Sequence, residues 1–365
     1  MQKNMYFDYF GGDCFAAVTE GDRLVEFHID PASAFDIFGN IYKGRVVNVL
    51  EGMQAAFVAF GQAKNGYLAA GDIPVADGTG EISANLNVKV GDEVMVQVLK
   101  SPIGTKGARL TMNLSFVGKH LIYLPNTPFL GVSRKISDEE ERARMLALAE
   151  KLRADGDGLI MRTNAPLADA KTLRTEAKYL QGMYQAAREA YANAGVGDLV
   201  HHDADVHVRL LRDFDLTELN KVYIGSETVY RRVESILKRA GRKNLAVLYD
   251  GPREMFDYFG LEKQINEILS PRVELSNGAY LVFDKTEALT VIDVNTGKFI
   301  GNTDSLEDTV FETNLLAAKE VARQARLRNM GGIVVVDFID MESEEHRAAV
   351  VEALREALKS DRAKC

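Results

Sequence analysis

The chain has 365 residues, of which 46% are hydrophobic and 27% charged. This composition is typical of a well-packed protein, and the length predicts two or more compact units. The sequence contains no run of eighteen apolar residues and does not begin with a basic segment followed by an apolar one, so we expect neither a membrane span nor a signal peptide. The two cysteines, Cys14 and Cys365, form neither a disulfide framework nor a zinc motif, which favours a reducing cytoplasm.

The net charge of −9, taken alone, argues against a nucleic-acid partner, because such proteins usually carry a basic patch. Basic residues do gather locally at Lys89, Lys100, Lys106 and Arg109, and again along residues 319–328. The charge is therefore only mild evidence against nucleic acid.

Residues 1–38 and about 203–270 are expected to pack together as one scaffold. FAAVTEGDRLVEFHID (15–30) has the pattern of a hairpin, and DVHVRLLRDF (205–214) and LAVLYDG (245–251) are predicted as strands beside a helix over 227–241. The acidic residues in these segments are scattered, so we expect no paired carboxylates at strand ends here.

Residues 39–118 alternate apolar and polar positions, with glycines at the turns, which predicts a small β-barrel interrupted by a loop over 76–86. Phe57 and Tyr67 fall on neighbouring strands of this barrel. Aromatic rings exposed on such a surface stack on the bases of single-stranded nucleic acid. The alternative, that both rings belong to the core, is equally open on composition.

Residues 119–202 predict strands within 120–128 and 158–165, a helix over 137–154 opened by Ser137, and a long helix ended at Gly195. Arg162 and Thr163 stand at the end of the second strand. A guanidinium fork beside a hydroxyl suits a phosphate. A surface ion pair of Arg162 is the other interpretation.

The last segment, 271–365, begins with a hairpin through Asn277-Gly278. Two apolar runs, LTVID (289–293) and IVVVD (333–337), then flank a helix predicted over 306–328, with Asp304 and Glu307 as a capping signal. A strand–helix–strand crossover pairs its strands in parallel, so their ends lie together at the edge where ligands bind in open α/β sheets.

That crossover places Asp293 and Asp337 side by side at the mouth of a buried sheet, where an unpaired carboxylate is costly. Each then needs a proton, a cation or a metal. Magnesium binds through few protein carboxylates, retains waters and activates phosphoryl chemistry. Asn295 is suited to orient either carboxylate, and Asp340 lies nearby. The alternative is that both acids merely cap turns.

Three runs, LTVIDVNTG (289–297), NLLAAKEVARQARLRNMGGIVVVDFIDM (314–341) and DRAK (361–364), resemble the catalytic core of the ribonuclease E/G family. The resemblance extends over nearly the whole chain and implies an α/β (α+β) multidomain fold. It implies a ribonuclease-H-like scaffold (1–38 and 203–270) with an inserted OB-fold barrel (39–118) and 5′-phosphate sensor domain (119–202). A DNase-I-like catalytic domain (271–365) follows.

The resemblance also implies three sets of site residues. The catalytic set is Asp293, Asn295 and Asp337, in which the two aspartates bind metal, with Asp340 in a supporting role. The RNA-binding set is Phe57, Tyr67 and Lys106. The set that binds a 5′-phosphate is Gly118, Ile122, Arg134, Arg162, Thr163 and Lys364. At position 364 the family more often has arginine; lysine keeps the positive charge but cannot make the two parallel hydrogen bonds of a guanidinium.

The implied activity is that of a magnesium-dependent endoribonuclease in the cytoplasm. It would cut single-stranded, A/U-rich RNA, be stimulated by a 5′-monophosphate, and act in rRNA or tRNA processing or mRNA decay. Longer members carry a Cys-x-x-Cys zinc link between two subunits, and this sequence has no such motif. We therefore expect either a fragment or a short form that dimerises otherwise or not at all, and a homodimer would not use a zinc link within this chain.

Two alternatives remain open. A non-catalytic RNA-binding protein would not need the acid pair, and a magnesium-dependent phosphatase or DNase would not need the aromatic barrel.

Overall fold

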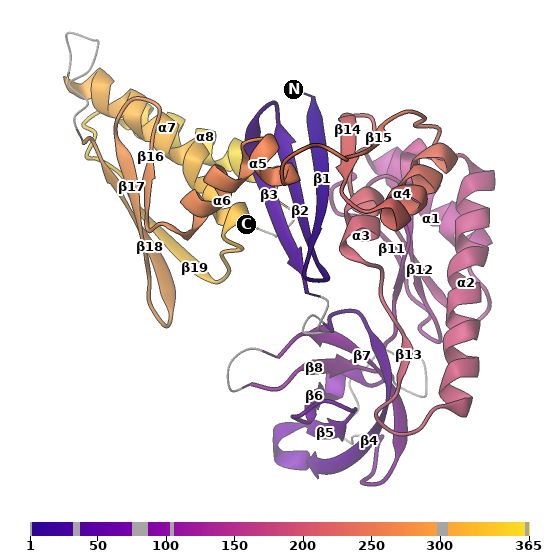
Figure 1. The fold of residues 1–365 in the computed structure, drawn as a ribbon. Coiled ribbons are helices and arrows are strands. Elements are labelled where there is room, and N and C mark those ends of the chain that lie inside the picture. Colours follow the sequence, from indigo (N-terminus) through magenta and orange to yellow (C-terminus); the bar gives the residue numbers. More distant parts are fainter. Residues whose placement is uncertain (1, 32–36, 75–86, 103–105, 298–305, 362–364) are drawn as a thin grey trace. The chain divides into compact units, whose positions relative to one another are not determined.

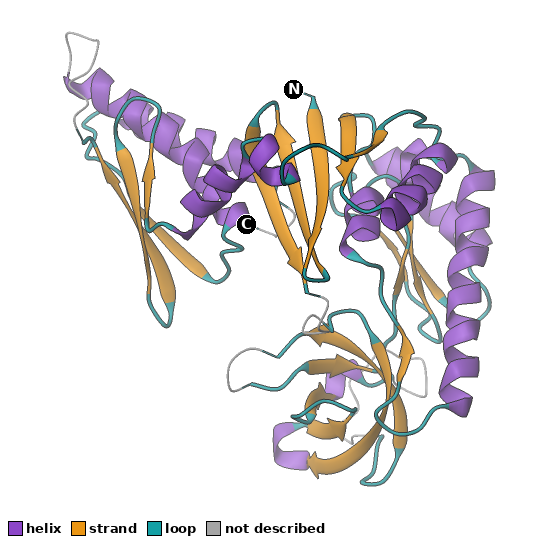
Figure 2. Ribbon diagram, viewed as in Figure 1, coloured by secondary structure: helices purple, strands orange, loops and turns teal. Residues whose placement is uncertain are grey.

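The computed structural model describes residues 2–31, 37–74, 87–102, 106–297, 306–361 and 365. The chain divides into two compact units: residues 1–32 with 215–365, and residues 33–214. Both combine sheets with helices (Figures 1 and 2), so the fold is mixed α/β. Among the described helices, none has the length and apolar character needed to cross a bilayer.

The first unit contains a five-stranded sheet in the order β15-β14-β1-β2-β3. Its strands are β1 (Lys3–Phe10), β2 (Asp13–Glu20), β3 (Arg23–Asp30), β14 (Leu219–Ile224) and β15 (Ala246–Leu248). The predicted N-terminal hairpin is confirmed, because β2 and β3 pair antiparallel, while β14 joins β1 in parallel. The helices of this part are α4 (Glu227–Arg239), α5 (Met255–Tyr258) and α6 (Leu261–Leu269).

The prediction of a strand over 205–214 is wrong, because these residues form helix α3 (Val206–Asp213) in the second unit. Val206, Leu210 and Leu211 are buried. This spacing follows the 3.6-residue period of a helix, whereas the strand interpretation matched only the alternation of Val206, Val208 and Leu210.

The first unit also holds a C-terminal sheet, in the order β16-β17-β18-β19. It comprises β16 (Arg272–Glu274), β17 (Tyr280–Lys285), β18 (Leu289–Asn295) and β19 (Ile333–Asp337), with helices α7 (Leu306–Leu327) and α8 (Glu344–Leu358). The predicted parallel crossover is confirmed, since β18 and β19 pair in parallel. Ile292, Val294 and Leu281 pack with Ala317 and Val321 of α7.

The capping signal predicted for α7 is only partly visible. Asp304 lies outside the described residues, and Glu307 accepts hydrogen bonds of 3.1 Å from the backbone N–H groups of Glu342 and Ser343. These two residues precede α8, so Glu307 ties the start of α7 to the start of α8.

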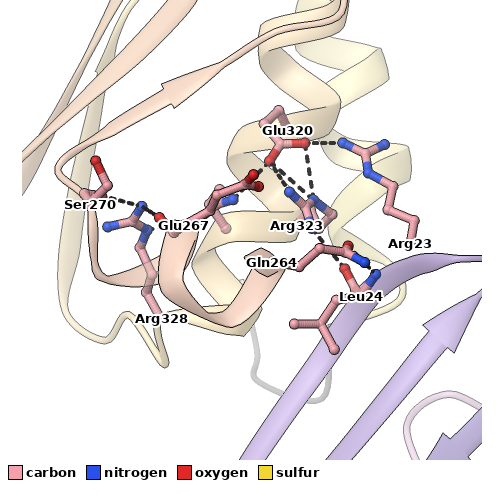
Figure 3. A network of polar contacts seen from close by, with 9 residues as sticks. Arg23, Leu24, Gln264, Glu267, Ser270, Glu320, Arg323 and Arg328 are labelled. Atoms are coloured by element: carbon pink, nitrogen blue, oxygen red, sulfur yellow. Dashed lines mark hydrogen bonds and ion pairs between the residues drawn. The ribbon is translucent and has the colours of Figure 1, made fainter. Parts of the chain in front are cut away.

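A buried carboxylate on α7 connects the C-terminal sheet to the first sheet (Figure 3). Glu320 is 3% exposed and pairs with Arg23, which begins β3, and with Arg323 on its own helix. Arg323 also donates to the carbonyl of Leu24 at 2.7 Å, and Leu24 N–H donates to Gln264 of α6 at 2.8 Å. Helix α7 is therefore attached to the β3 edge by charge as well as by packing.

The second unit contains a closed five-stranded barrel, consistent with an OB-like domain. Its strands run in the order β4-β5-β6-β8-β7, and pairing of β4 with β7 closes the ring, while β13 (Leu199–His201) extends it. The strands are β4 (Ile41–Leu50), β5 (Ala55–Ala59), β6 (Gly66–Ala69), β7 (Glu93–Lys100) and β8 (Arg109–Thr111), with short 3₁₀ turns at Glu51–Met53 and Ala70–Asp72. The predicted loop over 76–86 lies outside the described residues.

A four-stranded sheet completes the second unit, in the order β11-β12-β10-β9. It consists of β9 (Phe116–Val117), β10 (Leu121–Leu124), β11 (Leu130–Val132) and β12 (Gly158–Met161), accompanied by α1 (Glu139–Leu152), a 3₁₀ turn (Ala165–Leu167) and α2 (Ala170–Asn193). Both predicted helices form, but α1 is capped by Asp138 and not by Ser137. The ribonuclease-H-like and DNase-I-like assignments and the four-domain division stay predictions.

Candidate functional site

Asp293 and Asp337 are direct register partners across the parallel strands β18 and β19. Neighbouring strands lie roughly 4.8 Å apart, so the two carboxylates share one row on one face of the sheet. Asn295, two residues further along the same face, donates from Nδ2 to Oδ2 of Asp293 at 2.8 Å. The amide therefore orients one of the two carboxylates, as the sequence suggested.

The expectation that these acids sit at the mouth of a buried sheet is wrong. Both are exposed, and so are Ile333 and Val335 on the same face. The opposite face packs on α7 and α8, since Ile292, Val294 and Leu354 belong to one core. A carboxylate that is exposed to water does not need a partner, so burial is no argument for a metal ion at this site. The argument for a metal ion is that the two carboxylates lie close together.

Two carboxylates suit magnesium better than a metal ion that takes all of its ligands from the protein. Among the described residues, no group of three or more His, Cys, Asp or Glu side chains is placed to hold an ion. Magnesium commonly uses one or two carboxylates and completes its octahedron with waters and substrate phosphate oxygens. Asp293 and Asp337 fit that requirement.

A residue that the sequence did not single out supports the chain just after Asp337. Asn314 of α7 is fully buried and forms two hydrogen bonds with the backbone of Ile339, at 2.8 Å to the carbonyl and 3.2 Å from the N–H. These bonds hold the segment that leads from Asp337 to the exposed Asp340. The sequence did contain a sign of this role, because Asn314 is a polar residue on the apolar face of the predicted helix.

The barrel presents Phe57 and Tyr67 as a pair. They are register partners on β5 and β6, with ring centroids 6.0 Å apart at 70°. Both rings are half-buried and alternate with the buried core residues Val58 and Leu68, so they lie on the outer face of the barrel. The alternative that both rings form the core is thereby excluded.

Lys106, the third barrel residue, is exposed. It precedes Ala108 by two residues, and the carbonyl of Ala108 accepts a hydrogen bond of 2.8 Å from the N–H of Tyr67. The chain thus brings Lys106 alongside the strand that carries Tyr67.

Arg162 follows β12 and lies against the start of β10. Its Nη1 donates to the carbonyl oxygen of Gly118 at 2.5 Å. A Cβ on Gly118 would lie 2.0 Å from Oε1 of Glu176, so any other residue there would require the Glu176 carboxylate to move. That oxygen accepts from the N–H of His120 at 2.9 Å, so Glu176 fixes the loop that presents the Gly118 carbonyl.

Other residues predicted for the phosphate set gather at the same end of this sheet. Strands β11 and β12 are parallel, and Thr163, which follows β12, contacts Ser133, which follows β11, through hydroxyls 2.9 Å apart. Arg134 is exposed beside Ser133, and Ile122 lies half-buried on β10. Lys364 lies outside the described residues.

Arg162 also forms an ion pair, with Nη2 2.6 Å from Oδ1 of Asp213 at the end of α3. Arg212 reaches the same oxygen from Nε at 3.2 Å. The sequence interpretation missed both residues of α3, since it treated their segment as a scaffold strand.

By fold and site, the chain belongs with α/β proteins that combine a closed barrel with paired carboxylates on a parallel strand pair. A family model described as "Ribonuclease E/G family" matches residues 115–365. The chain is 39% identical over 359 residues to ribonuclease G of Haemophilus influenzae and 38% identical over 359 residues to that of Escherichia coli K12, covering 95% of this chain and 73% of each relative. It is 36% identical over 356 residues to ribonuclease E of a Nostoc species, covering 96% of this chain and 51% of the relative. The protein is a member of the ribonuclease E/G family.

Proposed function

We propose that this protein is a magnesium-dependent endoribonuclease that cuts single-stranded RNA at the Asp293–Asp337 pair. Membership of the ribonuclease E/G family supports the endoribonuclease class, and with it an RNA substrate. The observation that carries the position of the site is the direct pairing of Asp293 with Asp337, both exposed on one face.

Asp293 and Asp337 are the residues that would hold the magnesium ion. When bound, the ion would polarise the scissile phosphate and supply a water that is readily deprotonated. Asn295 keeps the Asp293 carboxylate in place through its amide. Asn314 of α7 keeps the segment after Asp337 in place through its hydrogen bond to the carbonyl of Ile339.

The barrel would hold the RNA strand. Phe57 and Tyr67 offer two ring surfaces on adjacent strands, and Lys106 offers a charge for the backbone. Stacking tolerates any base because every base has a π-face, so this surface favours single strands over duplexes. A preference for A/U-rich segments, where strands open easily, agrees with such a surface.

The end of the β11–β12 sheet would bind a 5′-monophosphate. Arg162 would supply the charge and Thr163 a hydroxyl, with Gly118, Ile122 and Arg134 from the same unit. Lys364, which the family resemblance adds to this set, lies outside the described residues. A phosphate held here would increase the effective concentration of the same RNA strand at the catalytic pair. Processing of rRNA and tRNA and decay of mRNA in the cytoplasm are the roles that such an enzyme serves.

Cleavage of a short A/U-rich single-stranded RNA in magnesium tests the proposal. The RNA is compared with 5′-monophosphate and 5′-hydroxyl ends, with a DNA of the same sequence, and with Asp293→Asn as the inactive control. Internal cleavage of RNA that requires magnesium, is faster with the monophosphate and disappears in the variant would support every part. Binding without cleavage would instead favour a non-catalytic RNA-binding protein, and cleavage of the DNA would favour a broader nuclease.

A further inference from the structure

The proposed phosphate-binding site includes an acidic side chain, Asp213. We propose that Asp213 is a positioning residue and the counter-ion of Arg162 at this site, which competes with the 5′-phosphate for Arg162 and so sets how strongly the enzyme prefers a monophosphate end. This inference rests on the proposed function of the Arg162 site.

The two Nη nitrogens of Arg162 are both engaged by protein oxygens. Nη1 donates to the carbonyl of Gly118 at 2.5 Å, and Nη2 pairs with Oδ1 of Asp213 at 2.6 Å. The side chains of the pair are 25% and 21% exposed, so solvent reaches the pair but does not surround it. An incoming phosphate therefore meets a guanidinium whose end is already bound to a carboxylate.

Arg212 shares that carboxylate. Its Nε lies 3.2 Å from Oδ1 of Asp213 and its Nη2 3.3 Å from Oδ2, while its Nη1 donates to the carbonyl of Val117 at 3.1 Å. Two arginines thus surround one aspartate at the end of β9, and the group keeps a single net positive charge. Burial alone would raise the pKa of the Asp213 carboxyl, but Arg212 and Arg162 hold it below its ordinary value.

The position of the Asp213 carboxylate between Arg162 and Arg212 has a direct electrostatic consequence for phosphate binding. A carboxylate beside a bound phosphate repels it, and the two compete for the same donors. Arg212 weakens this competition because it draws part of the Asp213 charge to itself. A 5′-hydroxyl carries no charge, so only the monophosphate end is affected.

The test compares cleavage rates of 5′-monophosphate and 5′-hydroxyl RNA, expressed as a ratio within each variant. Asp213→Asn keeps an acceptor oxygen for Arg162 but removes the charge, so the ratio should rise about two- to fivefold, the effect of a partly exposed charge pair. Asp155→Asn, which removes an exposed carboxylate in a turn of the same unit, controls for net charge and should leave the ratio unchanged.

A second variant keeps the proposal falsifiable if Asp213→Asn does not fold. Arg212→Gln leaves Asp213 to Arg162 alone and should lower the ratio by a similar factor. An unchanged or lowered ratio in Asp213→Asn, or an unchanged ratio in Arg212→Gln, would overturn the inference. If wild type itself shows no preference for the monophosphate, the proposed sensing function fails, which is a separate result.

Discussion

Asp293 and Asp337 lie directly opposite one another in the parallel pair β18–β19, although the whole of α7 separates them in the chain. On the next strand, β17, Val282 is the register partner of Asp293, so Val282, Asp293 and Asp337 lie side by side across three strands. The acid pair therefore stands on a solvent-exposed sheet face with apolar neighbours.

Replacing either acid of this pair by its amide should abolish cleavage while leaving RNA binding intact. Asn preserves the size of the side chain but removes the charge that holds a cation, so we expect Asp293→Asn and Asp337→Asn to lower the cleavage rate by at least about a hundredfold. Single-turnover cleavage and fluorescence anisotropy with the same RNA measure the two effects. Glu287→Gln, at an exposed position in the turn between β17 and β18, is the control for charge and should retain most activity. Near-wild-type cleavage in either main variant would remove that residue from the metal site.

The barrel aromatics should contribute to affinity and not to the chemical step. Loss of one stacking platform costs about 1–3 kcal/mol, so Phe57→Ala and Tyr67→Ala should each weaken RNA binding by about 5- to 150-fold. Tyr67→Phe keeps the ring and should bind RNA within about twofold of wild type. Equilibrium binding to a single-stranded RNA is the measurement. If the alanine variants bind as wild type does, the RNA path does not cross this face.

The buried carboxylate of α7 should matter for stability. Glu320→Ala leaves Arg323, which is 14% exposed, without its carboxylate partner inside the protein. Removing one partner of a buried ion pair costs about 3–5 kcal/mol. The exposed pair of Glu352 with Arg355 on α8 offers a control, since Glu352→Ala should change the unfolding free energy by at most about 1 kcal/mol. Denaturant midpoints of the two variants should therefore differ clearly; similar midpoints would mean that the network carries little energy.

The second unit should lose stability in acid through Glu176. Burial alone would raise the pKa of Glu176, but hydrogen bonds from the His120 side chain and from the backbone of His120 and Leu121 lower it below its ordinary value of 4.5. A lowered pKa stabilises the fold above pH 4.5, and the contribution is lost as the pH falls below it. Glu176→Gln should therefore be less stable than wild type at pH 7, and the difference in melting temperature should shrink below pH 4.5. A difference that stays constant with pH would contradict this account.

Local patterns in the sequence predicted much of the fold. Apolar spacing identified the helix after residue 306 and the two flanking strands, and Asn277-Gly278 identified a turn whose glycine has φ of +88°. At Val206–Asp213 the local pattern predicted the wrong element, because apolar alternation over a few residues fits a strand as well as a helix. Burial of Leu211 along with Leu210 decides for the helix, and burial depends on what the segment packs against.

Some of the site residues could be identified from the sequence and others could not. Asp293, Asn295 and Asp337 could be named from strand ends and family resemblance, since crossover topology brings parallel ends together. Asp213 could not be named, because nothing local to it points to Arg162. Their ion pair exists only once the end of α3 lies against Arg162, which follows β12, and against Val117 at the end of β9.

The sequence by itself determined the mixed α/β class, the barrel with its glycine turns, and the adjacency of the two strand-end acids. The strands, helices and turns follow from apolar spacing and glycine positions between residues close in the chain, and the adjacency of the acids follows from the parallel pairing that a strand–helix–strand crossover imposes. Only the tertiary structure decided which face of the C-terminal sheet is open, which carboxylate neutralises Arg162, and which buried polar groups of α7 bind Arg23 and Ile339. Those contacts join segments far apart in the chain, and their energies come from exclusion of water and from charge geometry, which exist only after the segments have packed.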